Sequence, residues 1–224
     1  MRRLQIDGHL ISDESPAFVI AEIGASHAGN LEKAKTMVEA AKKAGASAVK
    51  FQTRHPRDVY QKSDRRGAYY YESDNPQWMD RVYGKHRELL EFTLSEWTDL
   101  FRFCKHIGIT AFSTPFDVRS ADLLASLNVP AFKIASGDAT NIPLIKHVAR
   151  FGKPVIVSTG GCNEEDVDRA HEALISAPHA ILQCACIYPA PDDVMNLRVV
   201  QNYRQRFPFT GIGLSTHHKS WIPS

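Results

Sequence analysis

The chain has 224 residues, enough for one sizeable hydrophobic core, and its 27 basic and 25 acidic side chains give a formal net charge of +2. The basic residues form no run typical of a nucleic-acid-binding protein, and no apolar stretch reaches the length of a transmembrane helix. The two N-terminal arginines are not followed by an apolar segment, as a signal peptide would require. We therefore expect a cytoplasmic protein that binds neither nucleic acid nor membranes.

Seven short apolar runs predict buried parallel strands, because they are rich in β-branched or aromatic residues and bounded by glycine or proline. An additional N-terminal hairpin is predicted within residues 1–16, with its turn at Asp7-Gly8. The seven predicted strands are Phe18–Gly24, Ala48–Thr53, Ile109–Pro115, Ala131–Ser136, Pro154–Thr159, His179–Ala185 and Gly211–Thr216.

Amphipathic segments with start and stop signals for helices lie between these runs. The predicted N-caps are Asn30, Ser95, Asn141 and Asn163, and the glycines that end helices are Gly45, Gly108 and Gly152.

The alternation of strand and helix predicts an α/β fold of the TIM (β/α)8-barrel type, with seven of its eight strands present. Residues 1–224 are interpreted as a single barrel domain, and the chain stops where a seventh helix and an eighth strand would follow. On this ground we expect the chain alone to be marginally stable, oligomeric or dependent on a further C-terminal piece. Residues 54–93 form a long insertion, either a lid or binding loop or a surface excursion.

Polar residues follow or end every predicted strand, where the active site of a TIM barrel lies. Lys50 and Lys133 are the sharpest signal, because each sits between apolar neighbours and a buried ammonium is costly unless it is paired. Together with nearby hydroxyls and glycine-rich turns they predict a site for a phosphate or carboxylate. The alternative is that each lysine pairs with a structural acid or reaches solvent at its strand end.

Four other residues are less decisive. Glu22 is a candidate general base, a sugar-binding carboxylate or a partner for a lysine. His27 lies on the first loop after a strand and is interpreted as a surface histidine. His217 and His218 are adjacent, so only one can face a site, and one histidine does not make a metal site. The four cysteines, among them the C-x-C pair Cys184 and Cys186, lack zinc-site spacing and are interpreted as reduced, buried thiols.

The sequence resembles the N-acetylneuraminate (sialic acid) synthase family, which includes pseudaminate and legionaminate synthases. The resemblance rests on seven segments in family order: AEIGASHAGN, AGASAVKFQT, FSTPFD, FKIASGDATNIPLI, GKPVIVSTGG, IYPAPDDVMNL and GIGLSTHH. It implies a (β/α)8 barrel, often followed by a small antifreeze-like domain that this chain lacks, and a homodimer. It also implies condensation of phosphoenolpyruvate with an N-acetylated hexosamine, such as N-acetylmannosamine, with release of phosphate and with Mn²⁺ or Mg²⁺ as a Lewis acid.

Carried onto this chain, the resemblance assigns Glu22, Lys50 and Lys133 to catalysis and His217 to the metal. It assigns Gln52, Asp138 and Tyr188 to the sugar. The phosphoenolpyruvate residues would be Lys50, Thr114, Lys133, Ser136, Ser158 and Ser215.

The chain departs from the family pattern on the metal and sugar sides. The family's second metal-binding histidine belongs to the eighth strand. Thr216 stands where the family has an acid, and Asp138 where it usually has Glu. Gln183 replaces a usual His or Lys, and Cys186 replaces a polar residue that is often Asn.

Two other functions remain open from the sequence. One is a different barrel enzyme that uses phosphoenolpyruvate or a phosphosugar with another electrophile. The other is a non-catalytic fragment or pseudoenzyme, because the open edge of an incomplete parallel sheet invites pairing with another chain.

Overall fold

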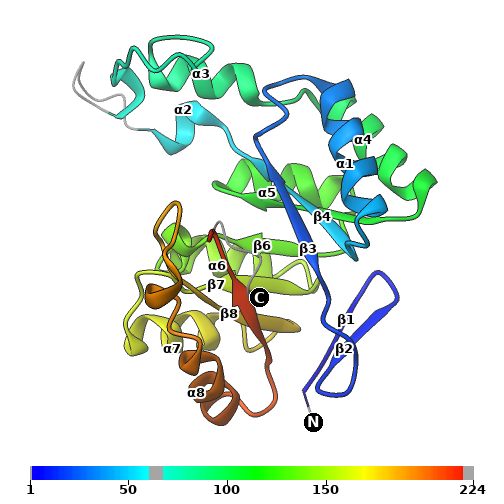
Figure 1. The fold of residues 1–224 in the computed structure, drawn as a ribbon, viewed down its shortest axis with the longest axis vertical. Coiled ribbons are helices and arrows are strands. Elements are labelled where there is room, and N and C mark those ends of the chain that lie inside the picture. The colour runs from blue at the N-terminus through cyan, green and yellow to red at the C-terminus, as the bar shows by residue number, and fades with distance from the viewer. Residues whose placement is uncertain (1, 61–67, 219–224) are drawn as a thin grey trace. The chain divides into compact units, whose positions relative to one another are not determined.

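The computed structural model describes residues 2–60 and 68–218, and its contacts divide the chain into two compact units. Phe18–Val129 form one unit, here called the Lys50 unit, and Met1–Ala17 with Pro130–Ser224 form the other, the Lys133 unit. In both units parallel strands alternate with helices (Figure 1). All seven predicted strands form, so the predicted α/β class with parallel strands of the (β/α)-barrel type is confirmed. The description of residues 1–224 as a single barrel domain stays a prediction.

The Lys50 unit contains a three-stranded parallel sheet in the order β3-β4-β5. Helices α1 and α4 pack against each other, and Trp97 of α4 lies edge-on to Phe51 of β4 with ring centroids 5.7 Å apart. Both side chains are buried in the unit's hydrophobic core. The elements are β3 (Ile20–Gly24), α1 (Leu31–Lys43), β4 (Ala48–Thr53), α2 (Pro56–Val59), η1 (Ala68–Tyr70), α3 (Tyr83–Leu90), α4 (Leu94–Ile107), β5 (Thr110–Pro115) and α5 (Val118–Ser126).

The cap of helix α4 lies two residues before the predicted one, at Thr93. Thr93, in extended conformation, accepts a hydrogen bond from the Glu96 backbone N–H, and the Glu96 carboxylate accepts one from the Thr93 N–H. Ser95 lies inside the first turn, so the prediction that it caps the helix is wrong. The capping box Thr93–Glu96 satisfies two of the free N–H groups at the helix start, which a Ser95 cap would not.

The insertion 54–93 carries α2, η1 and α3, while residues 61–67 lie outside the described residues. Trp78 stacks on the His86 ring with centroids 5.3 Å apart. Whether the insertion is a lid or a surface excursion stays open. His27 is buried at 1 % exposure, so its interpretation as a surface histidine is wrong. Its ring stacks on Phe92 at 4.3 Å, and burial together with the charge of Lys33 lowers its pKa to about 4.

The Lys133 unit contains a four-stranded parallel sheet in the order β6-β7-β8-β9 and the antiparallel hairpin β1–β2. The hairpin turns at Asp7 and Gly8, both at positive φ, and Asp13 ties it to α8 through an ion pair with Arg204 at 3.1 Å. The elements are β1 (Arg3–Ile6), β2 (His9–Ser12), β6 (Phe132–Ile134), η2 (Ser136–Asp138), α6 (Ile142–Ala149), β7 (Val155–Ser158), α7 (Glu164–Ala173), β8 (His179–Cys184), η3 (Asp192–Val194), α8 (Arg198–Arg206) and β9 (Gly211–Ser215).

The other predicted helix starts are confirmed. The side chains of Asn30, Asn141 and Asn163 each accept a hydrogen bond from the backbone N–H three residues later. No helix among the described residues is both long enough and apolar enough to cross a bilayer.

Candidate functional site

Lys133 of β6 is buried at 5 % exposure, and its ammonium donates hydrogen bonds to the Ser158 hydroxyl at 2.6 Å and to the Ile134 carbonyl at 2.7 Å. Among the described residues no carboxylate forms an ion pair with it. Burial lowers the pKa of Lys133 to about 7. An ammonium bound only to neutral oxygens in a buried place is stabilised by an anion, so this position is suited to one.

Ser136 and Gly160 lie beside this lysine. The Gly160 N–H donates to the Ser136 hydroxyl at 3.0 Å, and Gly160 directly follows the loop residue Thr159 after Ser158. A Cβ atom on Gly160 would lie 2.4 Å from the Cys186 sulfur and 3.0 Å from the Ser136 hydroxyl oxygen. Only glycine therefore lets the loop approach the end of β8 this closely. Cys184 is buried, but Cys186 is exposed, so its interpretation as a buried thiol is wrong. We call Lys133, Ser136, Ser158 and Gly160 the Lys133 cluster.

The Lys50 unit holds a second set of predicted residues. The Lys50 ammonium pairs with the Glu22 carboxylate and donates to the Thr114 hydroxyl at 3.2 Å. Lys50 is 9 % exposed and Thr114 2 % exposed. For Lys50 the alternative of an acidic partner therefore holds, since Glu22 supplies one. The ion pair fixes the Glu22 carboxylate at the end of β3, where it can accept a proton.

The remaining predicted residues lie near the ends of elements. Gln52 follows Lys50 on β4, and its side-chain oxygen accepts a hydrogen bond from Arg54. Asp138 ends η2 and accepts from the Asn141 amide at 3.2 Å. Tyr188 is 70 % exposed, and its ring centroid lies 4.0 Å from that of His217. Ser215 ends β9, half-buried and in register with Cys184 of β8.

The described residues do not complete a metal site around His217. The one described group of three whose ligand atoms lie within 4.8 Å of one another is His55, Asp58 and Asp117 in the Lys50 unit. This group could hold a metal ion, but its atoms already have partners. Asp117 caps α5 and lies 3.3 Å from the His55 ring, and Asp58 pairs with Arg119 at 3.1 Å.

Gln183 lies on the opposite face of the sheet from Lys133. Ser158 contacts Lys133 and pairs in register with Leu182, so the next residue, Gln183, points to the other face together with Thr159. There it donates to the Met195 carbonyl at 3.3 Å. The departure from the usual His or Lys at this position therefore does not change the charge beside Lys133.

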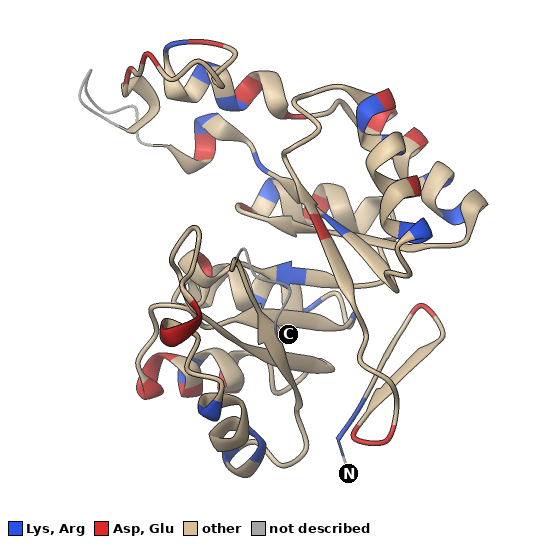
Figure 2. Ribbon diagram, viewed as in Figure 1, with Lys and Arg blue, Asp and Glu red and all other residues tan. Residues whose placement is uncertain are grey.

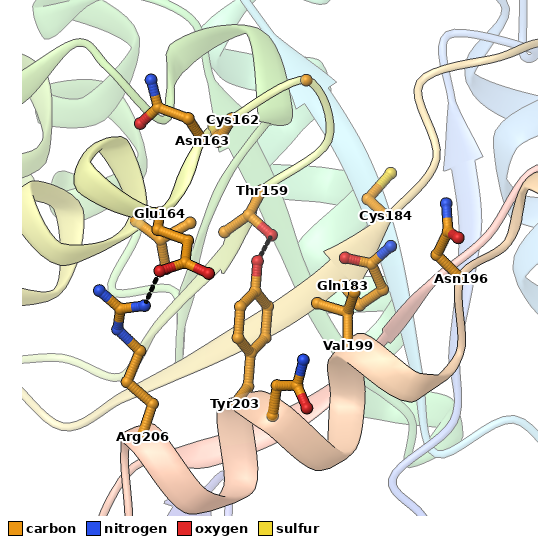
Figure 3. A pocket seen from close by; sticks show the side chains of 13 residues that line it. Thr159, Cys162, Asn163, Glu164, Gln183, Cys184, Asn196, Val199, Tyr203 and Arg206 are labelled. Carbon is orange, nitrogen blue, oxygen red and sulfur yellow. Dashed lines mark hydrogen bonds and ion pairs between the residues drawn. The ribbon is translucent and has the colours of Figure 1, made fainter.

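Gln183 and Thr159 line a cavity of about 480 Å³ between the sheet and helices α7 and α8 (Figure 3). The Thr159 and Tyr203 hydroxyl oxygens lie 2.9 Å apart within it. Acidic residues gather at the start of α7 and basic residues on α8 (Figure 2), and Arg206 joins the two helices through ion pairs with Glu164 and Asp168. The loop between β7 and α7 thus faces the Lys133 cluster on one side and this cavity on the other.

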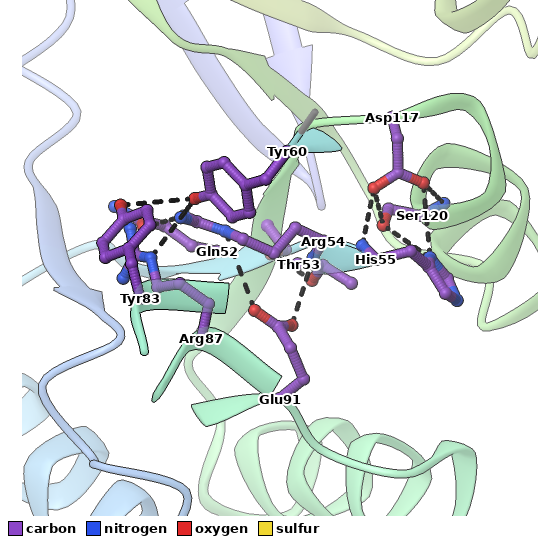
Figure 4. Close-up of polar contacts among 11 residues, drawn as sticks. Gln52, Thr53, Arg54, His55, Tyr60, Tyr83, Arg87, Glu91, Asp117 and Ser120 are labelled. Atoms are coloured by element: carbon purple, nitrogen blue, oxygen red, sulfur yellow. Dashed lines mark hydrogen bonds and ion pairs between the residues drawn. The ribbon is translucent and has the colours of Figure 1, made fainter. Parts of the chain in front are cut away.

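Sequence reasoning missed three features. The close approach of Gly160 to Cys186 was not predicted, although the Gly-Gly pair that follows Ser158-Thr159 was the available signal. The face of the sheet on which Gln183 lies could not be predicted, because it follows from the register between β7 and β8. Arg54 contacts Tyr60 and Glu91, and all three residues lie within the irregular insertion 54–93 (Figure 4). The hydrophobic periodicity of the sequence could not predict these contacts.

Comparison with known proteins adds a sequence match over most of the chain. Residues 37–222 match the NeuB family. N-acetylneuraminate-9-phosphate synthase of Drosophila melanogaster is 36 % identical over 224 residues, 98 % of this chain and 58 % of the relative. The human protein of the same name is 32 % identical over 212 residues, 94 % of this chain and 58 % of the relative.

Similarity to a solved structure extends over the whole chain. The crystal structure of N-acetylneuraminic acid (sialic acid) synthetase from Leptospira borgpetersenii superposes with a TM-score of 0.85 at 28 % identity. The match covers 99 % of this chain and 72 % of that one. This chain spans a little under two thirds of the length of the curated relatives it matches.

Proposed function

The chain belongs to the NeuB family, and from this premise we propose that it contains the barrel part of a nonulosonic acid synthase. The proposed reaction joins phosphoenolpyruvate to an N-acetylated hexosamine such as N-acetylmannosamine and releases phosphate. The observation that carries the proposal is the Lys133 cluster, in which a buried ammonium bound only to neutral oxygens lies at the end of a parallel strand.

Phosphoenolpyruvate is the anion that the Lys133 cluster is proposed to bind. Its carboxylate and phosphate oxygens are acceptors only, and the cluster offers the Lys133 ammonium and the hydroxyls of Ser136 and Ser158 as donors. The family resemblance assigns Ser215, and in the Lys50 unit Lys50 and Thr114, to the same substrate.

The proposed chemistry balances without an oxidant or reductant. Carbon 3 of phosphoenolpyruvate attacks the aldehyde carbon of the open-chain sugar, so that one carbon–carbon bond forms and the aldehyde oxygen becomes a hydroxyl. Water adds at carbon 2, and loss of inorganic phosphate from that carbon leaves the keto group. Glu22, fixed by Lys50, is proposed to take the proton of the attacking water or to orient the sugar.

Gln52, Asp138 and Tyr188 are the proposed sugar-binding residues, and His217 is a proposed ligand of a divalent metal ion. A bound Mn²⁺ or Mg²⁺ would act as a Lewis acid toward the sugar aldehyde. Among the described residues His217 belongs to no group of three potential ligands, so no step is assigned to this ion. A homodimer is proposed on the same family grounds.

Calorimetric titration of the 224-residue chain with phosphoenolpyruvate, with and without Mn²⁺, tests the proposal. We expect wild-type binding to be lost in Lys133→Ala and retained in Lys146→Ala, which removes an exposed lysine of α6. Circular dichroism of each variant shows whether it is folded. Phosphate release with N-acetylmannosamine is the activity assay once binding is established.

Absence of binding to a folded wild-type chain would contradict the proposal and favour a non-catalytic fragment. Phosphoenolpyruvate binding with turnover of aldoses that carry no N-acetyl group would favour a different electrophile within the same barrel type.

A further inference from the structure

Three cysteines gather around the loop between β7 and α7, beside the Lys133 cluster. Cys162 follows Gly160 by two residues on this loop, and Cys184 ends β8 two residues before Cys186 (Figure 3). A Cβ atom on Gly160 would lie 2.4 Å from the Cys186 sulfur and 3.0 Å from the Ser136 hydroxyl oxygen. Both atoms therefore lie within 3.0 Å of one point, which places the Cys186 thiol against the proposed anion site.

The sulfur of Cys186 is also within electrostatic reach of the buried ammonium. Burial lowers the pKa of Lys133, and the negative charges that Cys184 and Cys186 carry when ionised oppose this lowering. A thiol that is open to solvent and lies near a cationic side chain is the usual setting of a reactive cysteine. Neither thiol has a part in the proposed reaction, so their presence at this place calls for another role.

Accessibility distinguishes Cys186 from the other three cysteines, which also lie in the described part of the chain. Cys186 is exposed, Cys162 is half-buried, and Cys104 and Cys184 are buried. Burial raises the pKa of Cys104 to about 12, and burial together with the charge of Asp166 raises the pKa of Cys162. Because the thiolate is the nucleophile in exchange with disulfides, Cys104 and Cys162 are poorly suited to react at neutral pH.

Packing of the loop does not by itself account for this thiol. The Gly160 N–H donates to the Ser136 hydroxyl at 3.0 Å, and the Thr159 N–H donates to the Leu182 carbonyl at 3.1 Å. These hydrogen bonds hold the start of the loop without help from Cys186, whose side chain is open to solvent. A role in packing alone would also be met by a side chain with no reactive group.

We propose that Cys186 is a reversible modification site beside the Lys133 cluster, where it exchanges with small disulfides that carry carboxylates. The Cys186 thiol releases its proton to solvent, and the thiolate attacks one sulfur of the disulfide. A new sulfur–sulfur bond to Cys186 forms, the old one breaks, and the second half of the reagent leaves as a thiolate. No separate oxidant is required, and excess thiol reverses the exchange. The carboxylates are attracted by the ammonium of Lys133.

A mixed disulfide on Cys186 would close the anion site. The sulfur and the Ser136 hydroxyl lie within 3.0 Å of one point, so a group bonded to the sulfur lies next to a proposed donor to phosphoenolpyruvate. A carboxylate of that group can also take the place of the substrate anion at Lys133. The modification itself goes beyond the proposed function, whereas its effect on phosphoenolpyruvate rests on that function.

Mass spectrometry of the 224-residue chain after treatment with oxidised glutathione, which is anionic, or cystamine, which is cationic, locates the adduct and measures its rate. We expect Cys186 to react at least about tenfold faster than Cys162. Relative to the urea-unfolded chain, the folded chain should favour oxidised glutathione over cystamine by at least about fivefold, because the ammonium lies near the thiol.

Salt and lysine variants show whether the preference is electrostatic. High salt should reduce it in the wild-type chain, a measurement that depends on no variant. Lys133→Met should abolish it, provided that circular dichroism shows a folded protein. Lys146→Ala is the matched control, because it removes an exposed lysine of α6, and it should keep the preference.

Calorimetry then measures the effect on phosphoenolpyruvate. The adduct should weaken binding at least about tenfold, because it removes hydrogen bonds to a charged substrate, and dithiothreitol should restore the affinity. Cys186→Ser should retain binding and lose the sensitivity to oxidised glutathione, whereas Cys162→Ser should keep that sensitivity.

Reaction at Cys162 as fast as at Cys186 would overturn the assignment, as would the absence of any preference for the anionic disulfide in the folded wild-type chain. An adduct on Cys186 that leaves phosphoenolpyruvate affinity unchanged would also overturn it. A folded, unmodified chain that binds no phosphoenolpyruvate would instead contradict the proposed function, and the exchange rates would still decide whether Cys186 is the reactive thiol.

Discussion

The ammonium nitrogen of Lys133 lies 2.6 Å from the hydroxyl oxygen of Ser158, and a backbone carbonyl is its other described acceptor. Both acceptors are neutral, so burial of the charge is uncompensated in the free protein. The site therefore exchanges a proton near neutral pH and gains its full positive charge when an anion enters.

Phosphoenolpyruvate binding should weaken as the pH rises above neutrality. The pKa of Lys133, lowered to about 7 by burial, means that the free protein loses the ammonium charge between about pH 6 and pH 8. Above the pKa, each further pH unit should raise the dissociation constant by up to about tenfold until the pKa of the bound state is reached. Titrations from pH 6 to pH 9 measure this slope. Lys133→Met should give a weaker, flatter profile, and an identical profile would contradict the assignment.

Gly160→Ala should lose phosphoenolpyruvate affinity and stability together. The new methyl carbon would meet the Cys186 sulfur at 2.4 Å, and overpacking of this kind typically costs about 1–3 kcal/mol of unfolding free energy. Denaturant unfolding and calorimetry measure the two effects. Gly137→Ala is the control, because no atom lies within 4 Å of a Cβ there. Adding Cys186→Ala to Gly160→Ala should restore part of the loss, and no rescue would show that the contact is not the cause.

Thr93→Ala should destabilise the chain by about 1 kcal/mol, because it removes the oxygen that accepts from the Glu96 backbone N–H at the start of α4. Ser95→Ala, two residues later inside the first turn, should change stability by less than about 0.5 kcal/mol. Thermal or urea unfolding of both variants makes the comparison. The opposite ranking would show that the helix begins at Ser95.

Acidification should destabilise the protein through His27. The folded chain keeps this ring neutral down to its pKa of about 4, whereas an unfolded histidine titrates near 6.5. The unfolded state therefore binds more protons in this window, so the free energy of unfolding falls by up to roughly 3 kcal/mol as the pH drops through it. Urea unfolding between pH 7 and pH 4 should show a shallower loss in His27→Gln than in wild type. His106→Gln, an exposed histidine at the end of α4, should keep the wild-type slope.

Much of the fold could be predicted because its signals are local. Buried parallel strands are short, continuous apolar runs, and all seven formed where they were predicted. Asn30, Asn141 and Asn163 cap helices through contacts that span three residues. The prediction of Ser95 was wrong because Thr93 is an equally good cap by residue type, and only the chain's extended conformation at Thr93 separates the two.

The site could be predicted in part for the same reason. Burying a lysine inside a strand costs free energy unless the charge is paired. The apolar neighbours of Lys50 and Lys133 in the sequence indicate this burial, which the structure shows. Glu22 is among the possible lysine partners in the sequence, but its pairing with Lys50, like the contact of Ser158 with Lys133, depends on how neighbouring strands are aligned. The contacts of Arg54 with Tyr60 and Glu91 lie in an irregular insertion that has no hydrophobic periodicity, so the sequence could not predict them.

The loop between β7 and α7 has a consequence for the evolution of this chain. Gly160 belongs to the Lys133 cluster and donates to Ser136, while Thr159 and Cys162 line the cavity on the other side of the sheet. A substitution that moves this short loop therefore changes both the Lys133 cluster and the cavity. Selection on substrate binding consequently also constrains the shape of the cavity.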